Sequence, residues 1–194
     1  MCSIAGRNET VLVVIDVQVA VVASAWERDA VVGRIADLVA AARRAGVPVV
    51  WVQHSEPELP IGSDGWQLVP ELVPAPTEPI IRKRFRSTFE DTDFDEVLAR
   101  LDAAHLVVCG AETNNCVRFT AHAAIERGYD VTLVADAHTT TSMHWEAAEE
   151  WPAVHLEAAD IVAEANVAFW HYAVPGRDAR VAKAAAVVRA MHQA

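Results

Sequence analysis

The sequence predicts an α/β fold: a single-domain, doubly wound (Rossmann-like), mostly parallel sheet of about six strands with helices on both faces. Several short apolar runs lack polar alternation, which is typical of strands covered on both sides. Helical patterns separate these runs, and repeated strand–helix–strand units build parallel sheets. The 194 residues suit one domain, 1–194, with an ordinary core.

The first half of the chain contains the clearest strand–helix–strand unit. Residues 10–16 are an apolar run that ends in Asp16, residues 27–45 carry a helical stripe, and residues 47–53 are a second apolar run. Residues 54–79 hold six of the nine prolines and are expected to form an ordered loop. This loop either roofs a pocket or crosses the surface. Residues 79–83 form a short strand that ends in charge.

The second half of the chain repeats the alternation of strands and helices, and the pattern becomes less clear after Asp136. The expected elements are a helix from Thr92, a strand at 105–110, a helix around Cys116 that stops at Gly128, a strand at 129–136, a helix near 144–151, a last strand at 159–163 and a helix at 177–191. The last of these helices lies in residues 174–194, which we interpret as a C-terminal helical extension.

Charge and cysteine content narrow the range of partners and compartments. The net charge of −11 disfavours nucleic acid and anionic membranes as partners. The first ten residues lack the apolar region of a signal peptide, and no apolar run is long enough to span a bilayer. Three cysteines are too few for a disulfide framework. We therefore expect a cytoplasmic protein.

Cys116 is the candidate nucleophile. It is expected in the first turn of a helix, where free N–H groups and the helix dipole stabilise a thiolate and lower the pKa of the thiol. The same N–H groups can hold an oxyanion beside the sulfur. The competing thiol, Cys109, lies inside an apolar strand and is expected to be a small buried hydrophobe, whereas Cys2 is close to the terminus.

Asp16, Lys83 and Cys116 all follow predicted strand ends. In a parallel sheet these ends share one edge, so the three side chains can meet although they are distant in sequence. A lysine cation stabilises the thiolate and balances the acid, and the aspartate can accept the thiol proton and return it to a leaving amine. The backbone N–H groups of Glu112 and Cys116 are the candidate oxyanion hole.

Other side chains are candidates for contacting the substrate or for supporting the site. Arg84 and Arg86 are expected on a solvated face, and Phe85 is an aromatic that either walls the pocket or belongs to the core. The candidate substrate-binding residues are Gln18, Trp26, Trp66, Phe89 and His138.

Three blocks together resemble the isochorismatase-like cysteine hydrolase superfamily, which includes nicotinamidases and N-carbamoylsarcosine amidase. They are VLVVIDVQ at 11–18, KRFRSTFEDTDF at 83–94 and VVCGAETNNCVRFTAHAAIERGYDVTLVADAHTT at 107–140. The resemblance covers roughly residues 10–165. It implies an Asp16–Lys83–Cys116 triad and a non-proline cis peptide at Ala111–Glu112. Segments at 25–32, 51–66 and 175–177 look similar to streptothricin hydrolase-like members.

The resemblance implies hydrolysis of a C–N bond in an amide, lactam or ureido compound, because isochorismatases that cleave vinyl ethers typically lack the cysteine. A vinyl-ether hydrolase and a non-catalytic binding module on the same fold remain the alternatives. Nicotinamidases carry a metal-binding Asp and histidines after the second strand, whereas this chain has only His54 and Glu56 there. We therefore predict no metal and no cofactor. Members of the superfamily are usually dimers or tetramers, so a homo-oligomer is expected.

Overall fold

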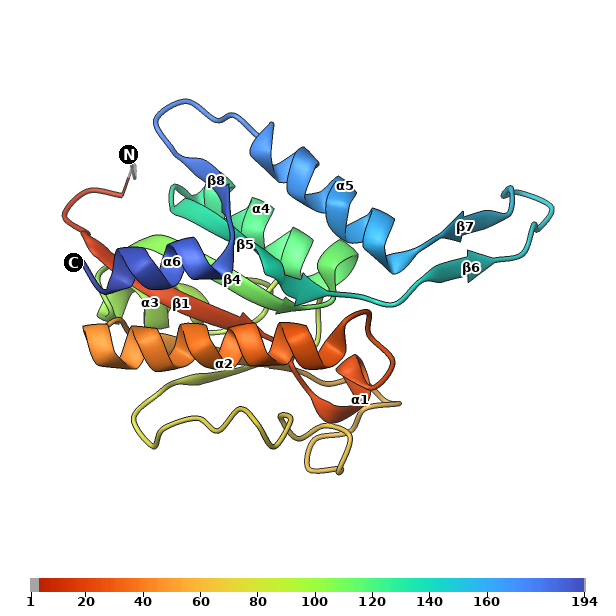
Figure 1. The fold of residues 1–194 in the computed structure, drawn as a ribbon, viewed down its shortest axis with the longest axis horizontal. Helices are drawn as coiled ribbons and strands as arrows, with labels where there is room; N and C mark the ends of the chain where they lie inside the picture. Colours follow the sequence, from red (N-terminus) through yellow and green to blue (C-terminus); the bar gives the residue numbers. More distant parts are fainter. Residues whose placement is uncertain (1–3, 194) are drawn as a thin grey trace.

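A computed structural model describes residues 4–193 and contains a six-stranded parallel sheet in the order β3-β2-β1-β4-β5-β8 (Figure 1). The strands are β1 (Glu9–Ile15), β2 (Val49–His54), β3 (Ile80–Lys83), β4 (Ala103–Ala111), β5 (Asp130–Thr139) and β8 (Ala179–Ala182). The predicted fold class, a doubly wound parallel sheet with helices around it, is confirmed.

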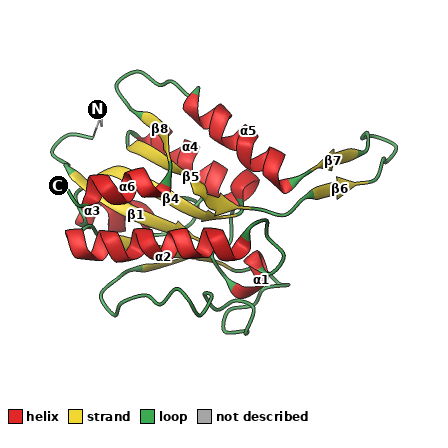
Figure 2. Ribbon diagram, in the orientation of Figure 1, coloured by secondary structure: helices red, strands yellow, loops and turns green. Residues whose placement is uncertain are grey.

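Helices cover both faces of this sheet, and a two-stranded hairpin projects from it (Figure 2). The helices are α1 (Val19–Val22), α2 (Arg28–Ala45), α3 (Phe94–Arg100), α4 (Arg118–Arg127), α5 (Ala158–Trp170) and α6 (Ala184–Met191), and the hairpin strands are β6 (Met143–Trp145) and β7 (Val154–Leu156). None of the helices in residues 4–193 is long and apolar enough to cross a bilayer.

The unbroken apolar run of β1 is explained by two separate cores. Leu12 and Val14 belong to the core under α2 and α6, which lie side by side in front of the sheet in Figure 1. Val11, Val13 and Ile15 belong to the core formed with α3 and α4 on the other face. Because successive side chains of a strand point to opposite faces, every position of such a strand must be apolar.

The order of the strands places a crevice beside β1. The chain adds β2 and β3 on one side of β1, and then returns to add β4, β5 and β8 on the other side. The C-terminal ends of β1 and β4 therefore lie at the point where the winding reverses. Open α/β sheets bind their ligands at such a point.

The proline-rich loop at residues 55–79 contains no helix or strand but is held to the body. Leu68 forms an isolated bridge with Gln18, and the Trp66 side chain is buried. The loop runs along one edge of the molecule (Figure 2).

The structure corrects the prediction for residues 144–163. The expected helix at 144–151 is absent, because Met143–Trp145 pairs in antiparallel fashion with Val154–Leu156. The expected strand at 159–163 is wrong too, since these residues lie in α5. Ile161, Ala165 and Phe169 repeat every four residues and are buried together, and this helical period extends well beyond the short apolar run.

The C-terminal segment is also corrected. The described part of this segment, residues 174–193, is not a helical extension, because it includes β8, which pairs with β5 as the sixth strand of the sheet. Asp136, expected at the end of a strand, lies three residues before the end of β5. Its Oδ1 atom accepts a hydrogen bond of 2.7 Å from the backbone N–H of Ala184, the first residue of α6. This bond satisfies one of the free N–H groups at the start of α6.

Candidate active site

Asp16 directly follows β1 and adopts a left-handed backbone with φ of 50°, which is uncommon for a residue other than glycine. The neighbouring strand β4 approaches β1 very closely here. A Cβ atom on Gly110 would lie 2.0 Å from the carbonyl oxygen of Ile15, so only glycine fits. Gly110 thereby allows the turn after β4 to lie next to Asp16.

Lys83 ends β3 and reaches the same place. Its side chain is fully buried, and its Nζ atom lies 2.6 Å from Oδ2 of Asp16 and 3.0 Å from Sγ of Cys116. Neither carboxylate oxygen of Asp16 forms a hydrogen bond of regular geometry within residues 4–193, so the contact with Lys83 is an ion pair. One ammonium group therefore joins the predicted acid to the predicted nucleophile.

Cys116 lies in the turn Thr113–Val117, which connects β4 to α4. The turn is kinked at Asn115, where φ is −117° and ψ is −109°. The carbonyl oxygen of Glu112 accepts hydrogen bonds from the backbone N–H groups of Asn115 and Val117. The sulfur is thus placed immediately before α4 rather than in the first turn of a regular helix. The Ala111–Glu112 peptide bond is cis, as the resemblance implied.

The predicted lowering of the thiol pKa is wrong. Burial and the neighbouring Asp16 carboxylate raise the pKa of Cys116 to about 12, although Lys83 opposes them. For Lys83 itself, burial acts to lower the pKa, but the charges of Asp16 and Cys116 outweigh it and the net shift is upward. At neutral pH the Cys116 thiol is therefore neutral, and it lies beside the Lys83 ammonium.

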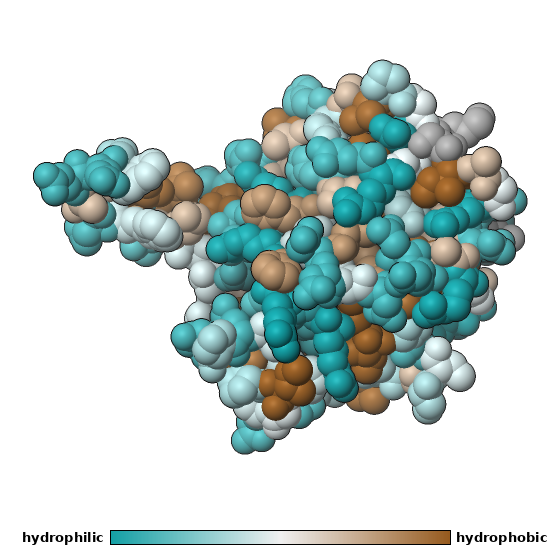
Figure 3. Space-filling model, turned by 180° about the vertical axis from the view of Figure 1, so that it is seen from behind, coloured by the Kyte–Doolittle hydropathy of each residue, from teal (hydrophilic) through white to brown (hydrophobic). Residues whose placement is uncertain are grey.

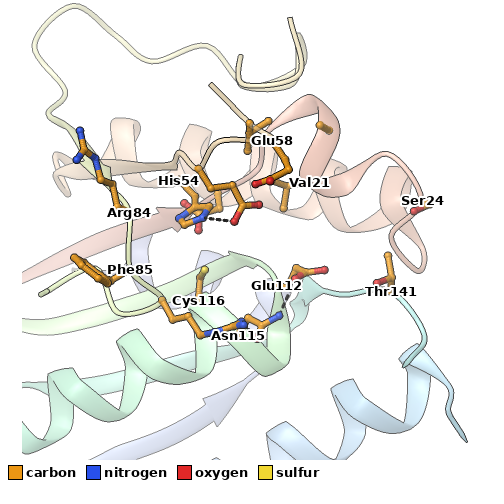
Figure 4. A pocket seen from close by; sticks show the side chains of 15 residues that line it. Val21, Ser24, His54, Glu58, Arg84, Phe85, Glu112, Asn115, Cys116 and Thr141 are labelled. Carbon is orange, nitrogen blue, oxygen red and sulfur yellow. Dashed lines mark hydrogen bonds and ion pairs between the residues drawn. The ribbon is translucent and has the colours of Figure 1, made fainter. Parts of the chain in front are cut away.

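A cavity of about 710 Å³ opens above these groups (Figure 4). Asp16 and Cys116 lie in its lining, together with Glu112 and Asn115 from the turn after β4. The remaining lining residues are Ala20, Val21, Ser24, His54, Glu56, Glu58, Leu59, Arg84, Phe85, Arg86 and Thr141. Because residues 56, 58 and 59 belong to the proline-rich loop, that loop forms part of the cavity wall.

Two of the candidate substrate-binding residues, Gln18 and Trp66, connect segments that form the cavity wall. Nε2 of Gln18 donates hydrogen bonds to the carbonyl oxygens of His54 and Trp66, and its Oε1 accepts one from the backbone N–H of His54. Gln18 thus ties the end of β2 to the proline-rich loop. Neither Gln18 nor Trp66 is among the residues that line the cavity.

Trp26 and Phe89 also lie outside the cavity lining. Phe89 is buried in the core beneath α3 and α4, where its ring packs against Phe94. Trp26 is partly exposed and contributes its backbone, whose N–H donates to the carbonyl oxygen of Thr140. Phe89 therefore supports the fold around the site through its ring, and Trp26 does so through its backbone.

His138 lies inside β5, fully buried, and not in a loop that faces the pocket. Its Nδ1 atom is 2.9 Å from Oγ1 of Thr113, and its Nε2 atom is 3.0 Å from Oδ1 of Asn166. The Asn166 oxygen can only accept, so the proton is assigned to Nε2, and Nδ1 accepts from the Thr113 hydroxyl. His138 thus links α5 to the first residue of the turn that carries Cys116.

Arg84 and Arg86 are exposed, as expected for a solvated face, and they also line the cavity with Phe85. Arg86 donates to Oδ1 of Asn115 and so contacts the turn that carries Cys116. The Arg84 side chain is directed away from Cys116 in Figure 4. His54, considered only as a weak metal ligand, was missed as part of the site. Its position at the end of β2 is the same signal that identified Asp16 and Lys83.

The second cysteine in the described part of the chain, Cys109, is not at the site. Cys109 is fully buried in β4, and burial raises the pKa of its thiol. Cys2 lies outside residues 4–193. Within that range, no group of three or more His, Cys, Asp or Glu side chains is arranged to hold a metal ion.

The described geometry agrees with a known family. The family model described as "Isochorismatase domain" matches residues 10–164, a stretch that includes Asp16, Lys83 and Cys116. The chain belongs to the isochorismatase family. The fold is similar to that of an isochorismatase from Pseudomonas putida KT2440, with a TM-score of 0.78. The two chains are 28% identical in sequence, and the match covers 92% of this chain and 89% of that one.

Two curated relatives are similar in sequence to this isochorismatase-family chain. A streptothricin hydrolase of Streptomyces noursei is 39% identical over 142 residues, which are 69% of this chain and 56% of the relative. The ureidoacrylate amidohydrolase RutB of Methylobacterium radiotolerans is 32% identical over 139 residues, which are 55% of this chain and 54% of the relative. The chain thus spans only about half the length of these two proteins.

Proposed function

We propose that this chain is a cysteine hydrolase that cleaves a C–N bond of a small amide, lactam or ureido compound through a thioester acyl-enzyme. The contact of one buried ammonium, Lys83, with both the Asp16 carboxylate and the Cys116 sulfur carries this proposal. A binding module does not need this arrangement, and a vinyl-ether hydrolase does not need the thiol.

In the first half-reaction, Asp16 accepts the proton of the neutral Cys116 thiol while the sulfur attacks the carbonyl carbon. The carbonyl oxygen becomes an oxyanion, which the backbone N–H groups of Glu112 and Cys116 stabilise. Asp16 then gives its proton to the leaving nitrogen. The C–N bond breaks, the amine or ammonia departs, and the acyl group stays on sulfur as a thioester.

In the second half-reaction, a water molecule attacks the thioester carbon and Asp16 accepts one of its protons. The C–S bond breaks, the acid product leaves, and the proton of Asp16 returns to sulfur. The Lys83 ammonium keeps its charge throughout. It offsets the negative charge on Asp16 in the resting site and on sulfur during attack, so no step leaves an unpaired buried anion.

The raised pKa of Cys116 is compatible with this sequence of steps, because the proton leaves sulfur only when a carbonyl carbon is present. The names of the two curated relatives, a streptothricin hydrolase and a ureidoacrylate amidohydrolase, support a C–N bond as the target.

The acidic net charge supports a small-molecule partner rather than nucleic acid or an anionic membrane. A catalytic thiol suits a reducing compartment, and we propose the cytoplasm.

The test is release of ammonia or amine from a panel of small amides, lactams and ureido compounds. Wild type is compared with Cys116→Ala and with Cys109→Ala, a matched control that removes the buried thiol of β4. We expect turnover that vanishes in Cys116→Ala and persists in Cys109→Ala. Acid quenching during turnover should trap the acyl group on Cys116, detectable as a mass increase of the peptide that contains it.

A different pattern would replace the proposal. If the chain hydrolyses a vinyl ether and Cys116→Ala keeps that rate, the thiol is incidental and Asp16 acts as an acid. If no substrate is turned over while a compound binds without change, the chain is a binding module.

A further inference from the structure

His54 is a cavity residue that the proposed reaction does not use. It is the last residue of β2 and pairs in register with Lys83, the last residue of β3. Its Nδ1 atom lies 3.4 Å from Nζ of Lys83, and its Nε2 atom lies 3.5 Å from Oε2 of Glu56. In Figure 4 the ring lies at the cavity wall that faces Cys116.

The surroundings of the Lys83 ammonium explain why this contact matters. An ammonium group has three protons and no acceptor. Four atoms that can accept a hydrogen bond surround Nζ: Oδ2 of Asp16, Sγ of Cys116, the carbonyl oxygen of Phe85 at 3.2 Å and Nδ1 of His54. Because the Lys83 side chain is fully buried, these protein atoms must satisfy its protons.

We propose that His54 is a positioning residue for Lys83. In its neutral form with the proton on Nε2, the ring directs that proton towards Glu56 and presents the lone pair of Nδ1 to the ammonium. Nδ1 shares one proton of Nζ with the Phe85 carbonyl. Nζ also donates to Cys116 and forms the ion pair with Asp16, so the ring fixes the cation between acid and nucleophile. This role rests on the proposed function of the triad.

The backbone around His54 is held independently of its ring. Gln18 bonds both the N–H and the carbonyl oxygen of residue 54, and β2 pairs with β3 through the backbone. Substituting the side chain therefore leaves the end of β2 in place. The loss of the Nδ1 acceptor is then the main change that Lys83 experiences.

The experiment compares His54→Leu, His54→Asn and His54→Gln in the full chain. The Oδ1 atom of asparagine can take the place of Nδ1, whereas the amide of glutamine lies near the place of Nε2. The first readout needs no substrate. It is the rate at which iodoacetamide alkylates Cys116, followed across a pH series by mass spectrometry of the peptide that contains Cys116. The second readout is kcat and KM on any substrate that the panel identifies.

We expect His54→Leu to lower the alkylation rate at a given pH and to lower kcat about tenfold, which corresponds to one hydrogen bond to a charged group. His54→Gln should behave like His54→Leu, and His54→Asn should return to within about threefold of wild type. KM should change less than kcat, since the ring acts through Lys83. His171→Leu, at an exposed histidine after α5, is the matched control and should match wild type.

The proposal is overturned if all three variants alkylate like wild type, or if His54→Asn is as slow as His54→Leu while both unfold at the same temperature as wild type. If His54→Leu does not fold, the Asn–Gln pair still decides, because equal rates for those two remove the acceptor role. The alkylation series remains informative if the panel yields no substrate. Failure of the proposed function and failure of this role are therefore distinguishable.

Discussion

Lys83 shows how much one residue can depend on its surroundings. The sequence places it at the end of a strand. Because the ends of parallel strands share one edge of the sheet, its contact with Asp16 and Cys116 can be predicted from the topology. The protonation states do not follow, because they depend on burial: the side chains of Lys83 and Asp16 are almost completely inaccessible. Desolvation penalises the charged thiolate more than the single lysine cation stabilises it, so the pKa of Cys116 rises.

His138 leads to a prediction about stability at low pH. Burial lowers the pKa of His138 from 6.5 to about 4, so the folded state keeps the ring neutral where the unfolded chain binds a proton. The stabilisation is complete above the unfolded pKa and is lost as the pH falls towards the folded value. Between about pH 7.5 and about pH 5, wild type should lose about 2 kcal/mol more free energy of unfolding than His138→Gln.

Urea unfolding at the two pH values measures this difference. Other groups also titrate in this range, but they do so in both proteins, and their contribution cancels in the comparison. His171→Gln, at an exposed histidine, is the control and should keep the pH dependence of wild type. Equal pH dependence in wild type and His138→Gln would show that the buried ring is not held neutral.

At the scale of elements, Glu78 holds the C-terminal end of the proline-rich loop. The Oε2 atom of Glu78 accepts hydrogen bonds from Nε1 of Trp51 at 2.7 Å and from the N–H of Ala75 at 2.8 Å. Both of its oxygens also accept from the Arg43 guanidinium at 2.8 Å. One carboxylate thus joins the loop to β2 and α2, and this contact supports the loop that forms the cavity wall.

Glu78→Ala should lower the free energy of unfolding by about 2–3 kcal/mol, because it leaves the buried Trp51 N–H without its acceptor. Glu71→Ala is the matched control on the same loop. Glu71 pairs with Arg28 at the surface, and an exposed ion pair contributes at most about 1 kcal/mol. Chemical denaturation measures both variants. Similar costs for the two would mean that Glu78 is not the main attachment of the loop.

At the scale of the whole molecule, the β6–β7 hairpin extends away from the rest of the fold. It projects from the end of the sheet (Figure 1), and in the opposite view its tip is mostly hydrophilic whereas apolar groups gather near its base (Figure 3). Trp145 and Trp151 are 65% and 70% exposed, and Trp170 on the adjoining helix α5 is 68% exposed. A lone two-stranded hairpin is only marginally stable in water, and exposed aromatic side chains of this kind are typical of a contact with another protein chain.

We predict that the chain forms a dimer or tetramer in which this hairpin packs on a second copy. The double variant Trp145→Ser/Trp151→Ser should shift the assembly towards monomer, because it removes most of the exposed aromatic surface of the hairpin. Sedimentation velocity over a concentration series measures the shift. Val73→Ser, at an exposed apolar residue of the proline-rich loop, is the control and should leave the assembly unchanged. A monomeric wild type would contradict the prediction.

The sequence alone was sufficient for the parallel sheet, most of its strands and the meeting of Asp16, Lys83 and Cys116. These features follow from local patterns: apolar runs buried on both faces, helical stripes between them, and polar residues at strand ends. In a parallel sheet such ends come together whatever the details of packing.

Only the tertiary structure decided the identity of the sixth strand, the hairpin, the buried place of His138 and the protonation of Cys116. The strand β8 pairs with β5, which ends forty residues earlier, and the helical tendency of residues 144–151 gave way to pairing between Met143–Trp145 and Val154–Leu156. Such pairings depend on distant segments that a local pattern does not contain. Desolvation likewise depends on every group that packs around an atom, which only the complete fold specifies.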